Sequence, residues 1–200
     1  MPGIDILLAK SLSSALKEKI DKKILLELEI KLFEEHGISI KQSIGQFQKL
    51  DNTLNGFLGS DTRELEKECF ESICSIKNLD KDYQVILKDK TLNKIVFDCW
   101  GDIENQKILN VILNESLTTP ELVTKSGISK TSIYRNISSL INEGLIVNDG
   151  IVRTDDGKIV PKYKSIFDQV TIMISTDMIS ISGLVRKKFI NESTVCQILF

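Results

Sequence analysis

The sequence predicts a mainly α fold with a small β component, in which an N-terminal helical bundle precedes a helix-turn-helix segment and a β-hairpin. Leucine and isoleucine at helical spacing dominate the first half of the 200 residues. No glycine occurs between Gly59 and Gly101, and the whole chain has three prolines. Because glycine and proline are the residues that most often interrupt helices, their scarcity favours long helices.

The first helices are delimited by polar caps and glycines. Ser13 or Ser14 is expected to begin a short helix that ends at Lys19. Asp21 begins a longer helix, which Gly37 ends. The apolar residues of this second helix cover more than one face, so we expect it to be the central helix of the bundle.

Two further helices complete the predicted bundle. One begins at Ser39 and ends at Gly59, and the next begins at Asp61, whose side chain is expected to cap it. We assign residues 1–76 to a helical regulatory domain and residues 77–101 to a connecting segment. Residues 77–83 are polar and predict a linker. Residues 84–100 are ambiguous, because VIL suggests a short strand while TLNKIVFDCW has helical spacing, and the boundary between the two stays open.

A three-helix segment follows in residues 102–146, and residues 118–146 are expected to form a helix-turn-helix within it. Residues 102–115 have a helical apolar pattern, with Ile103 among the residues expected to be buried. Thr119 is expected to cap the next helix, with Pro120 in its first turn. Gly127 suits the turn, because a turn residue often needs positive φ, and Ser129 is expected to cap the third helix.

The outer face of the third helix consists mostly of short hydrogen-bonding residues. Its apolar residues lie within about 100° of the helix circumference, and Arg135 is at the centre of the opposite face. A helix that meets only solvent usually carries Glu and Lys there. Since the DNA major groove admits one helix, this composition favours a helix that reads duplex DNA.

A basic hairpin is predicted directly after the helix-turn-helix. Residues 147–167 alternate around Asp156 and Gly157, which is a strong hairpin turn signal. Lys158, Lys162 and Lys164 fall on one face of the returning strand by period two. Between residues 125 and 164 seven basic and four acidic residues give a charge of +3, whereas the whole chain carries −2. The local field is therefore only mildly positive.

The segment SKTSIYRNISSLINEGLI resembles the recognition-helix pattern of winged helix-turn-helix transcription regulators of the ArsR-like and MarR-like groups. The resemblance covers residues 102–167 and implies a DNA-binding domain. The residues expected to contact DNA are Ser129, Lys130, Thr131, Ser132, Tyr134, Arg135, Ser139, Asn142, Arg153, Lys158, Lys162 and Lys164.

The N-terminal half is similar to a small helical output domain of signalling proteins from ammonia-oxidising archaea, the Nitrosopumilus output domain. The similarity covers residues 12–76 and is carried by the segments around Gly37–Ile40 and Phe57–Glu66. It implies an archaeal regulator with an upstream signalling partner on these helices.

Residues 168–200 predict a second hairpin and a short amphipathic helix. Val170, Ile172 and Ile174 alternate, and Met178, Ile179 and Ile181 have no obvious core of their own. We therefore expect a homodimer on a two-fold symmetric DNA site, formed through this segment with a contribution from the bundle. The alternative is that the segment folds back on the first half.

Enzymatic activity, a metal site and a cofactor are not expected. The sequence lacks a glycine-rich phosphate loop, G-x-S-x-G and H-E-x-x-H, and it has one histidine, His36. Its four cysteines have no C-x-x-C spacing. Residues 4–12 are too short to span a bilayer, so we expect a cytoplasmic protein. The alternative to DNA binding is a winged-helix module that binds only other proteins.

Overall fold

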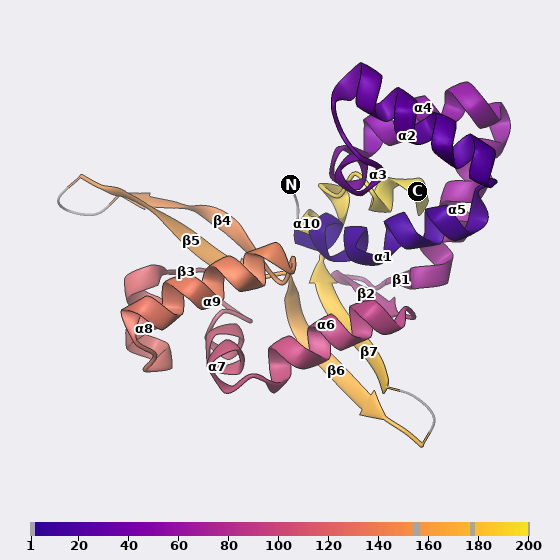
Figure 1. Cartoon of the computed structure of the whole chain (residues 1–200). Coiled ribbons are helices and arrows are strands. Elements are labelled where there is room, and N and C mark those ends of the chain that lie inside the picture. Colours follow the sequence, from indigo (N-terminus) through magenta and orange to yellow (C-terminus); the bar gives the residue numbers. More distant parts are fainter. Residues whose placement is uncertain (1–2, 154–156, 177–178, 200) are drawn as a thin grey trace.

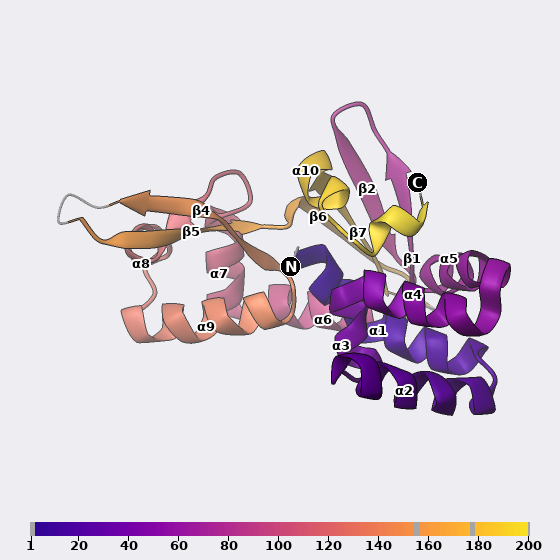
Figure 2. The ribbon, with the colours of Figure 1, turned by 90° about the horizontal axis from the view of Figure 1, so that it is seen from above.

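The computed structural model describes residues 3–153, 157–176 and 179–199, excluding the side chains of residues 198 and 199. The fold is mostly helical, with two antiparallel sheets (Figures 1 and 2). The helical half α1–α5 lies at one end of the molecule, and the hairpin formed by β4 and β5 projects from the other end. Within the described ranges, none of the helices is long and apolar enough to cross a membrane.

The central helix of the helical half is α1, Gly3–Lys19. It begins well before the predicted start at Ser13 or Ser14, and its buried face includes Ile4, Leu8 and Leu12. It contacts α5, α6 and α10. Residues 4–12 are therefore core helix, and the prediction that residues 21–36 supply the central helix is wrong.

Helix α2, Lys22–His36, lies at the outside of the molecule (Figure 2). Its predicted ends are confirmed, because Asp21 caps it by accepting a hydrogen bond from the Lys23 amide at 2.8 Å, and Gly37 ends it with φ 66°. Leu28 and Leu32 are buried, while Leu26, Ile30 and Phe33 are exposed. The apolar residues that suggested a central position thus lie partly in solvent.

The segment that follows Ser39 is interrupted instead of forming one helix. Ser39 and Gln42 form a capping box at α3, Ile40–Ser43. The 3₁₀ turn η1, Ile44–Gln46, then leads into α4, Phe47–Leu58, which ends at Gly59 as expected. After η2, Gly59–Asp61, helix α5 spans Thr62–Ile73. Asp61 occupies its N-cap position without making the capping hydrogen bond that the sequence suggested.

The predicted polar linker at residues 77–83 is a β-hairpin. Strands β1, Cys74–Asn78, and β2, Asp82–Leu87, pair antiparallel with Cys74 opposite Leu87. Helix α6, Lys90–Gly101, follows and is capped by Asp89. The ambiguous segment 84–100 therefore contains a strand and then a helix.

The C-terminal segment completes the sheet that this hairpin begins. Strands β6, Phe167–Ile174, and β7, Ile179–Arg186, form the expected second hairpin, and the sheet order is β1-β2-β7-β6. The expected amphipathic helix is divided into α10, Lys187–Asn191, and η3, Cys196–Leu199. Because β7 pairs with β2, residues 74–87 and 167–186 belong to one sheet.

The tail after β7 returns to α1. Asp5 accepts hydrogen bonds from the Thr194 amide at 3.2 Å, from the Thr194 hydroxyl at 3.0 Å and from the Ser193 hydroxyl. Val195 and Cys196 are buried. The tail therefore packs as the alternative prediction said, because it folds back on the first half of the chain.

The remaining elements form the unit that contains the helix-turn-helix segment. They are α7, Ile103–Val111; β3, Leu117–Thr118; α8, Thr119–Ser126; α9, Lys130–Asn142; β4, Ile146–Arg153; and β5, Ile159–Ser165. The strands form an antiparallel sheet of order β3-β5-β4.

Helix α1 packs directly on the end of α9. Gly144, with φ 79°, follows α9, and a Cβ at this position would lie 2.5 Å from the Gly3 carbonyl oxygen and the Leu7 amide nitrogen. Lys10 of α1 also forms an ion pair with Glu143 at 3.2 Å. The first helix of the chain thus contacts the end of α9, the helix that the sequence analysis predicts to bind DNA.

Candidate nucleic-acid interface

Local capping sets the positions of the three helices. Asp102 caps α7 by accepting a hydrogen bond from the Asn105 amide at 2.8 Å. Thr118, and not the expected Thr119, caps α8 and forms a capping box with Glu121. Gly127 has φ 69° in the turn, as expected. Ser129 caps α9 and accepts a hydrogen bond from the Ser132 amide at 3.2 Å, which confirms the predicted start.

The apolar side of α9 anchors the helix in the core of this unit. Ile133, Ile137 and Leu140 are buried, and α9 contacts α7, α8 and β4. In α7, Ile108 and Leu109 are buried, but Ile103 is exposed, contrary to the prediction. Packing on one side leaves the opposite face of α9 accessible.

Most of the predicted recognition residues do reach the surface on α9 and its cap. Ser132 is half-buried, and the exposed members are Ser129, Lys130, Thr131, Tyr134, Arg135, Ser139 and Asn142. Their side chains supply hydroxyl, amide, ammonium and guanidinium groups, which can bond base edges and phosphates.

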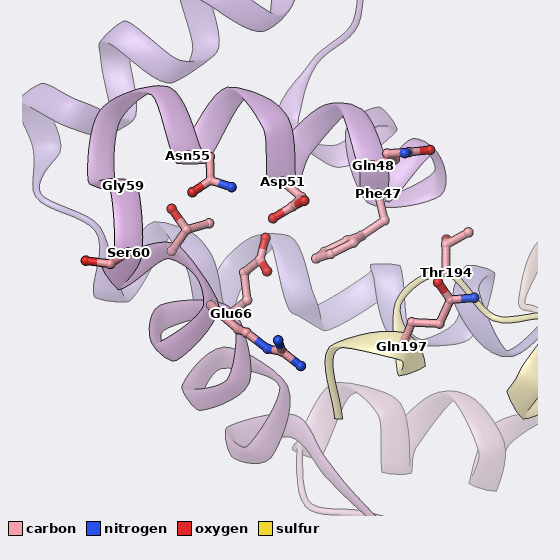
Figure 3. A pocket seen from close by; sticks show the side chains of 11 residues that line it. Phe47, Gln48, Asp51, Asn55, Gly59, Ser60, Glu66, Thr194 and Gln197 are labelled. Carbon is pink, nitrogen blue, oxygen red and sulfur yellow. The ribbon is translucent and has the colours of Figure 1, made fainter. Parts of the chain in front are cut away.

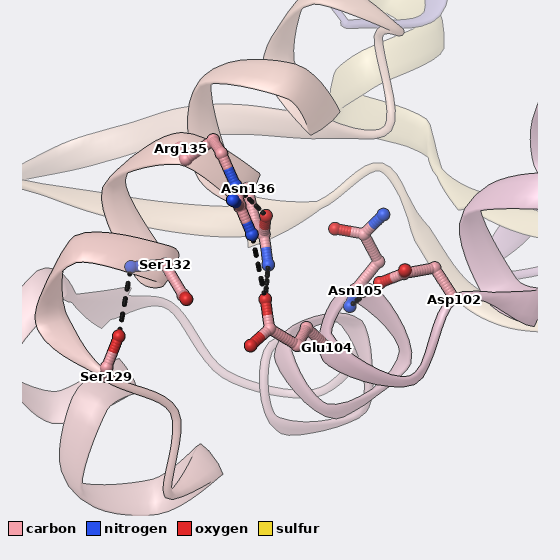
Figure 4. Close-up of polar contacts among 7 residues, drawn as sticks. All are labelled: Asp102, Glu104, Asn105, Ser129, Ser132, Arg135 and Asn136. Atoms are coloured by element: carbon pink, nitrogen blue, oxygen red, sulfur yellow. Dashed lines mark hydrogen bonds and ion pairs between the residues drawn. The ribbon is translucent and has the colours of Figure 1, made fainter.

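Arg135 is held by an acid from α7 (Figure 4). Its guanidinium donates to Glu104 Oε2 at 3.3 Å, and the buried Asn136 amide donates to the same oxygen at 2.9 Å. The Arg135 side chain is 74% exposed, so its ion pair with Glu104 is a surface pair. Exposed pairs of this kind contribute about 0–1 kcal/mol, and a phosphate could replace the carboxylate.

Glu104 and Asn136 are the residues of this face that sequence reasoning missed. Asn136 lies three residues after Ile133 and four before Leu140, a spacing that places it beside the buried stripe. This spacing was an available signal for burial. Glu104 carried no comparable signal, because its distance from α9 depends on how the two helices pack.

Of the four basic residues predicted to contact DNA from the hairpin, three reach its surface. Arg153, at the end of β4, and Lys158, just before β5, are exposed, and Lys162 on β5 is half-buried. The strands pair antiparallel as expected, with Arg153 opposite Ile159. Asp156 of the predicted turn lies outside the described residues, and Gly157 has φ 80°.

Lys164 does not belong to the surface of the hairpin. Its side chain is 0% exposed, forms an ion pair with Asp168 at 3.1 Å and donates to the Leu113 carbonyl oxygen. Burial lowers the pKa of Lys164, and the hydrogen bond to Asp168 opposes this effect. Period two placed Lys164 on the same strand face as Lys162, but this face turns into the core towards the end of β5. Its assignment as a phosphate contact is wrong.

Acidic side chains moderate the charge of this surface. Besides Glu104, Glu115 forms an ion pair with Lys125 of α8, and Glu121 lies in the first turn of α8. Hydrogen bonds from the Thr118 amide and hydroxyl lower the pKa of Glu121. The surface therefore combines a few exposed cations with neutral hydrogen-bonding groups, as the local charge of the sequence indicated.

The cysteines are buried or half-buried away from this face and are free. Burial raises the pKa of Cys69 to about 12 and that of Cys99 to about 11. Thiols with such pKa values stay protonated near neutral pH and are poor nucleophiles.

Comparison with known protein families, curated proteins and solved structures found no match to the chain.

Proposed function

We propose that the chain is a sequence-specific DNA-binding transcription regulator that acts in the cytoplasm. The observation that carries this proposal is the exposed face of α9, where Ser, Thr and Asn side chains surround Arg135 beside a projecting hairpin with basic residues. The element order α7-β3-α8-α9-β4-β5 is that of winged helix-turn-helix domains. In such domains the second helix of the motif enters the major groove.

Each part has a distinct role in this proposal. The polar residues on α9 and its cap contact base edges and nearby phosphates; they are Ser129, Lys130, Thr131, Ser132, Tyr134, Arg135, Ser139 and Asn142. Arg153, Lys158 and Lys162 contact the phosphate backbone, which fixes position without reading sequence. Glu104 is replaced by DNA at Arg135, since both ligands accept hydrogen bonds from the same guanidinium.

Selection of bound duplexes from a random pool, followed by titration of the selected duplex at several salt concentrations, tests the proposal. DNA binding predicts enrichment of a defined sequence and an affinity that falls as salt rises, with a logarithmic slope of about −0.9 for each phosphate neutralised. Failure to bind any duplex at low salt would contradict it.

The alternative function is a winged-helix module that binds only proteins. The pairing of Arg135 with Glu104 and the weak net charge of the surface favour this alternative. It predicts that the chain binds no duplex, and that substitutions on α9 weaken a protein complex with little dependence on salt.

We also propose that the regulator is a homodimer. Met173, Ile174 and Ile179 are exposed near the end of the β6–β7 hairpin and provide an apolar contact surface. Ile181, by contrast, is buried in the sheet and is no longer a candidate, while Met178 lies outside the described residues. Two recognition helices about 34 Å apart would match one turn of DNA. Light scattering that shows a monomer, both free and on DNA, would exclude the dimer.

The exposed apolar stripe of α2 is the surface that we assign to a signalling partner. Leu26, Ile30 and Phe33 follow one another at spacings of four and three residues and lie on the outside of the molecule. Substituting all three by polar residues should abolish such an interaction without affecting DNA binding.

A further inference from the structure

A cavity of about 570 Å³ opens between α4, α5 and the C-terminal segment (Figure 3). The residues that line it are distant in sequence from α9. Its volume lies in the range of small-molecule binding sites. The lining combines charged, amide and aromatic groups, including Phe47, Asp51, Asn55, Arg63, Glu66 and Gln197.

Glu66 is the unusual member of this lining. It is 4% exposed, and its Oε1 atom has no hydrogen-bond partner among the residues that the structure describes. The same holds for the hydroxyl of Thr62, one turn earlier on α5. Figure 3 shows the carboxyl groups of Glu66 and Asp51 pointing towards one another. Since a buried polar group without a partner destabilises a protein, this carboxyl is suited to a ligand that supplies the missing donor.

The charged groups that line the cavity indicate the charge of the ligand that would fit it. Burial and the neighbouring charge of Asp51 raise the pKa of Glu66 to about 8, and the charge of Arg63 opposes this shift. If Glu66 loses its proton, the two carboxylates and one guanidinium sum to −1. One cationic group therefore balances the site.

We propose that this cavity binds a small organic cation, whose single ammonium or guanidinium group lies between Glu66 and Asp51. The ring of Phe47 points into the same space and can contact the cation or its apolar part (Figure 3). The side-chain amides of Asn55 and Gln197 provide further hydrogen-bonding groups at the wall.

An organic cation fits this lining better than a metal ion does. Calcium takes six to eight oxygen ligands, and magnesium requires a nearly ideal octahedron of oxygen ligands that usually includes several waters. Among the described residues, no group of three or more His, Cys, Asp or Glu side chains is arranged to hold a metal. An aromatic ring and a volume larger than an ion also favour an organic molecule.

The wall of the cavity is connected to α1, and through α1 to the end of α9. Thr194 lines the cavity and also donates two hydrogen bonds to Asp5 of α1. The N-terminal end of α1 in turn packs on Gly144 at the end of α9. The binding proposal itself is independent of the proposed DNA binding, because it is tested without DNA.

Isothermal titration of the full chain with 2-phenylethylamine and butylguanidine tests the proposal. Neutral 2-phenylethanol and MgCl₂ serve as reference ligands. We expect at least one of the two cations to bind, and the two reference ligands to bind much more weakly. Because binding favours the ionised form of Glu66, protons should be released at about pH 7 and not at about pH 9. Titration in buffers of different ionisation enthalpy measures this release.

Three variants separate a cation site from a nonspecific effect. Glu66→Gln and Asp51→Asn should each weaken binding about ten-fold or more, because each removes a charged acceptor. Glu64→Gln removes the same charge from an exposed position on the same helix and should leave affinity unchanged. Asp51→Asn, at a half-buried position, keeps the test valid if the Glu66 variant folds poorly. Absence of cation binding, equal binding of 2-phenylethanol, or equal affinity of the Glu66 and Asp51 variants and the wild type would overturn the proposal.

Discussion

The roles of two polar residues, Arg135 and Glu66, depend on what lies near them. Arg135 is exposed and pairs with one acid of a neighbouring helix, so its guanidinium can exchange partners at small cost. Glu66 is buried against a second acid, so its protonation is coupled to the stability of the fold. The two residues lead to different experiments, one on DNA affinity and the other on stability as a function of pH.

Substitutions at Arg135 and Glu104 should change DNA affinity in opposite directions. Arg135→Ala should weaken binding to a selected duplex by about 1–3 kcal/mol, because a base or phosphate contact is lost. Glu104→Gln should tighten binding up to about five-fold, since it removes a competing charge and keeps an oxygen that can accept from Asn136. Fluorescence anisotropy measures both effects, and thermal melting should show little change for Arg135→Ala. Unchanged affinity of the Arg135 variant would remove this residue from the interface.

Glu66 should make stability fall as the pH rises. The ordinary pKa of a glutamate, 4.5, applies to the unfolded chain, whereas the folded value is about 8. Between these values the folded state binds a proton that the unfolded state lacks. The free energy of unfolding then decreases with pH, by up to about 1.4 kcal/mol for each unit, and levels off above the folded pKa.

Urea denaturation of the wild type and of Glu66→Gln over about pH 5 to pH 8 measures this contribution. The difference in unfolding free energy between the two proteins should grow with pH in favour of the variant. Glu64→Gln, at an exposed position of the same helix, is the control and should follow the wild type. Parallel curves for wild type and Glu66→Gln would show that Glu66 has no raised pKa.

At the scale of elements, strand β5 shows that residues on one face of a strand can have different environments. Lys162 is half-buried near the middle of the strand, and Lys164 is fully buried two residues later. The outer part of the hairpin projects from the molecule, while its base packs near α7 through the contact of Lys164 with Leu113. The proposed phosphate contact of Lys162 and the core contact of Lys164 are therefore separated along one strand.

The exposed part of the hairpin should determine the salt dependence of DNA binding. Replacing Lys158 and Lys162 by Gln should weaken binding to all duplexes alike and reduce the salt slope by about one for each lost phosphate contact. Replacing Lys22 and Lys67, two exposed lysines of the helical half, is the matched control and should leave the slope unchanged. If both double variants had the same slope of DNA affinity against salt, the hairpin would not contact the DNA backbone.

Lys164→Met should instead reduce stability by about 3 kcal/mol, because the Leu113 carbonyl and Asp168 each lose a buried partner. Arg186 would still contact Asp168 at 2.7 Å. Urea denaturation measures the loss, and Lys158→Met at the exposed position is the control. A loss of DNA salt slope without a loss of stability would contradict the buried position of Lys164.

At the scale of the whole molecule, the first helix and the tail after β7 contact each other. The tail after β7 donates to Asp5, and α1 packs both on the helical half and on the end of α9. The sheet β1-β2-β7-β6 joins residues from the middle of the chain to the C-terminal hairpin. The segments on either side of the expected boundaries at residues 76, 101 and 167 thus pack against one another in a shared core.

Asp5→Ala should release the C-terminal tail and destabilise the whole protein. The side chain accepts hydrogen bonds from Ser193 and Thr194, and loss of a buried acceptor costs about 1–3 kcal/mol. Hydrogen exchange should become faster in residues 193–199, and the urea midpoint should fall. Asp5→Asn keeps one acceptor oxygen and should have a smaller effect. Unchanged exchange in the tail of the Asp5→Ala variant would show that these bonds do not hold it.

The sequence alone determined the features that depend on neighbours a few residues apart. The caps at Asp21, Ser39 and Ser129 and the stops at Gly37 and Gly59 were predictable, because capping bonds join residues close in sequence and left-handed backbone favours glycine. The composition of the outer face of α9 was likewise readable from helical periodicity, as was most of the candidate interface.

Only the tertiary structure decided which apolar helix is central, which strands pair in the sheet β1-β2-β7-β6, and which basic side chains stay on the surface. Helix α1 is buried although α2 has the broader apolar pattern, since burial depends on contacts with α5, α6 and α10 that are distant in sequence. Lys164, Glu104 and Glu66 acquired their environments in the same way, from partners on other elements. Their roles follow from packing between elements, and periodicity along a single helix or strand can indicate a buried face but not which element covers it.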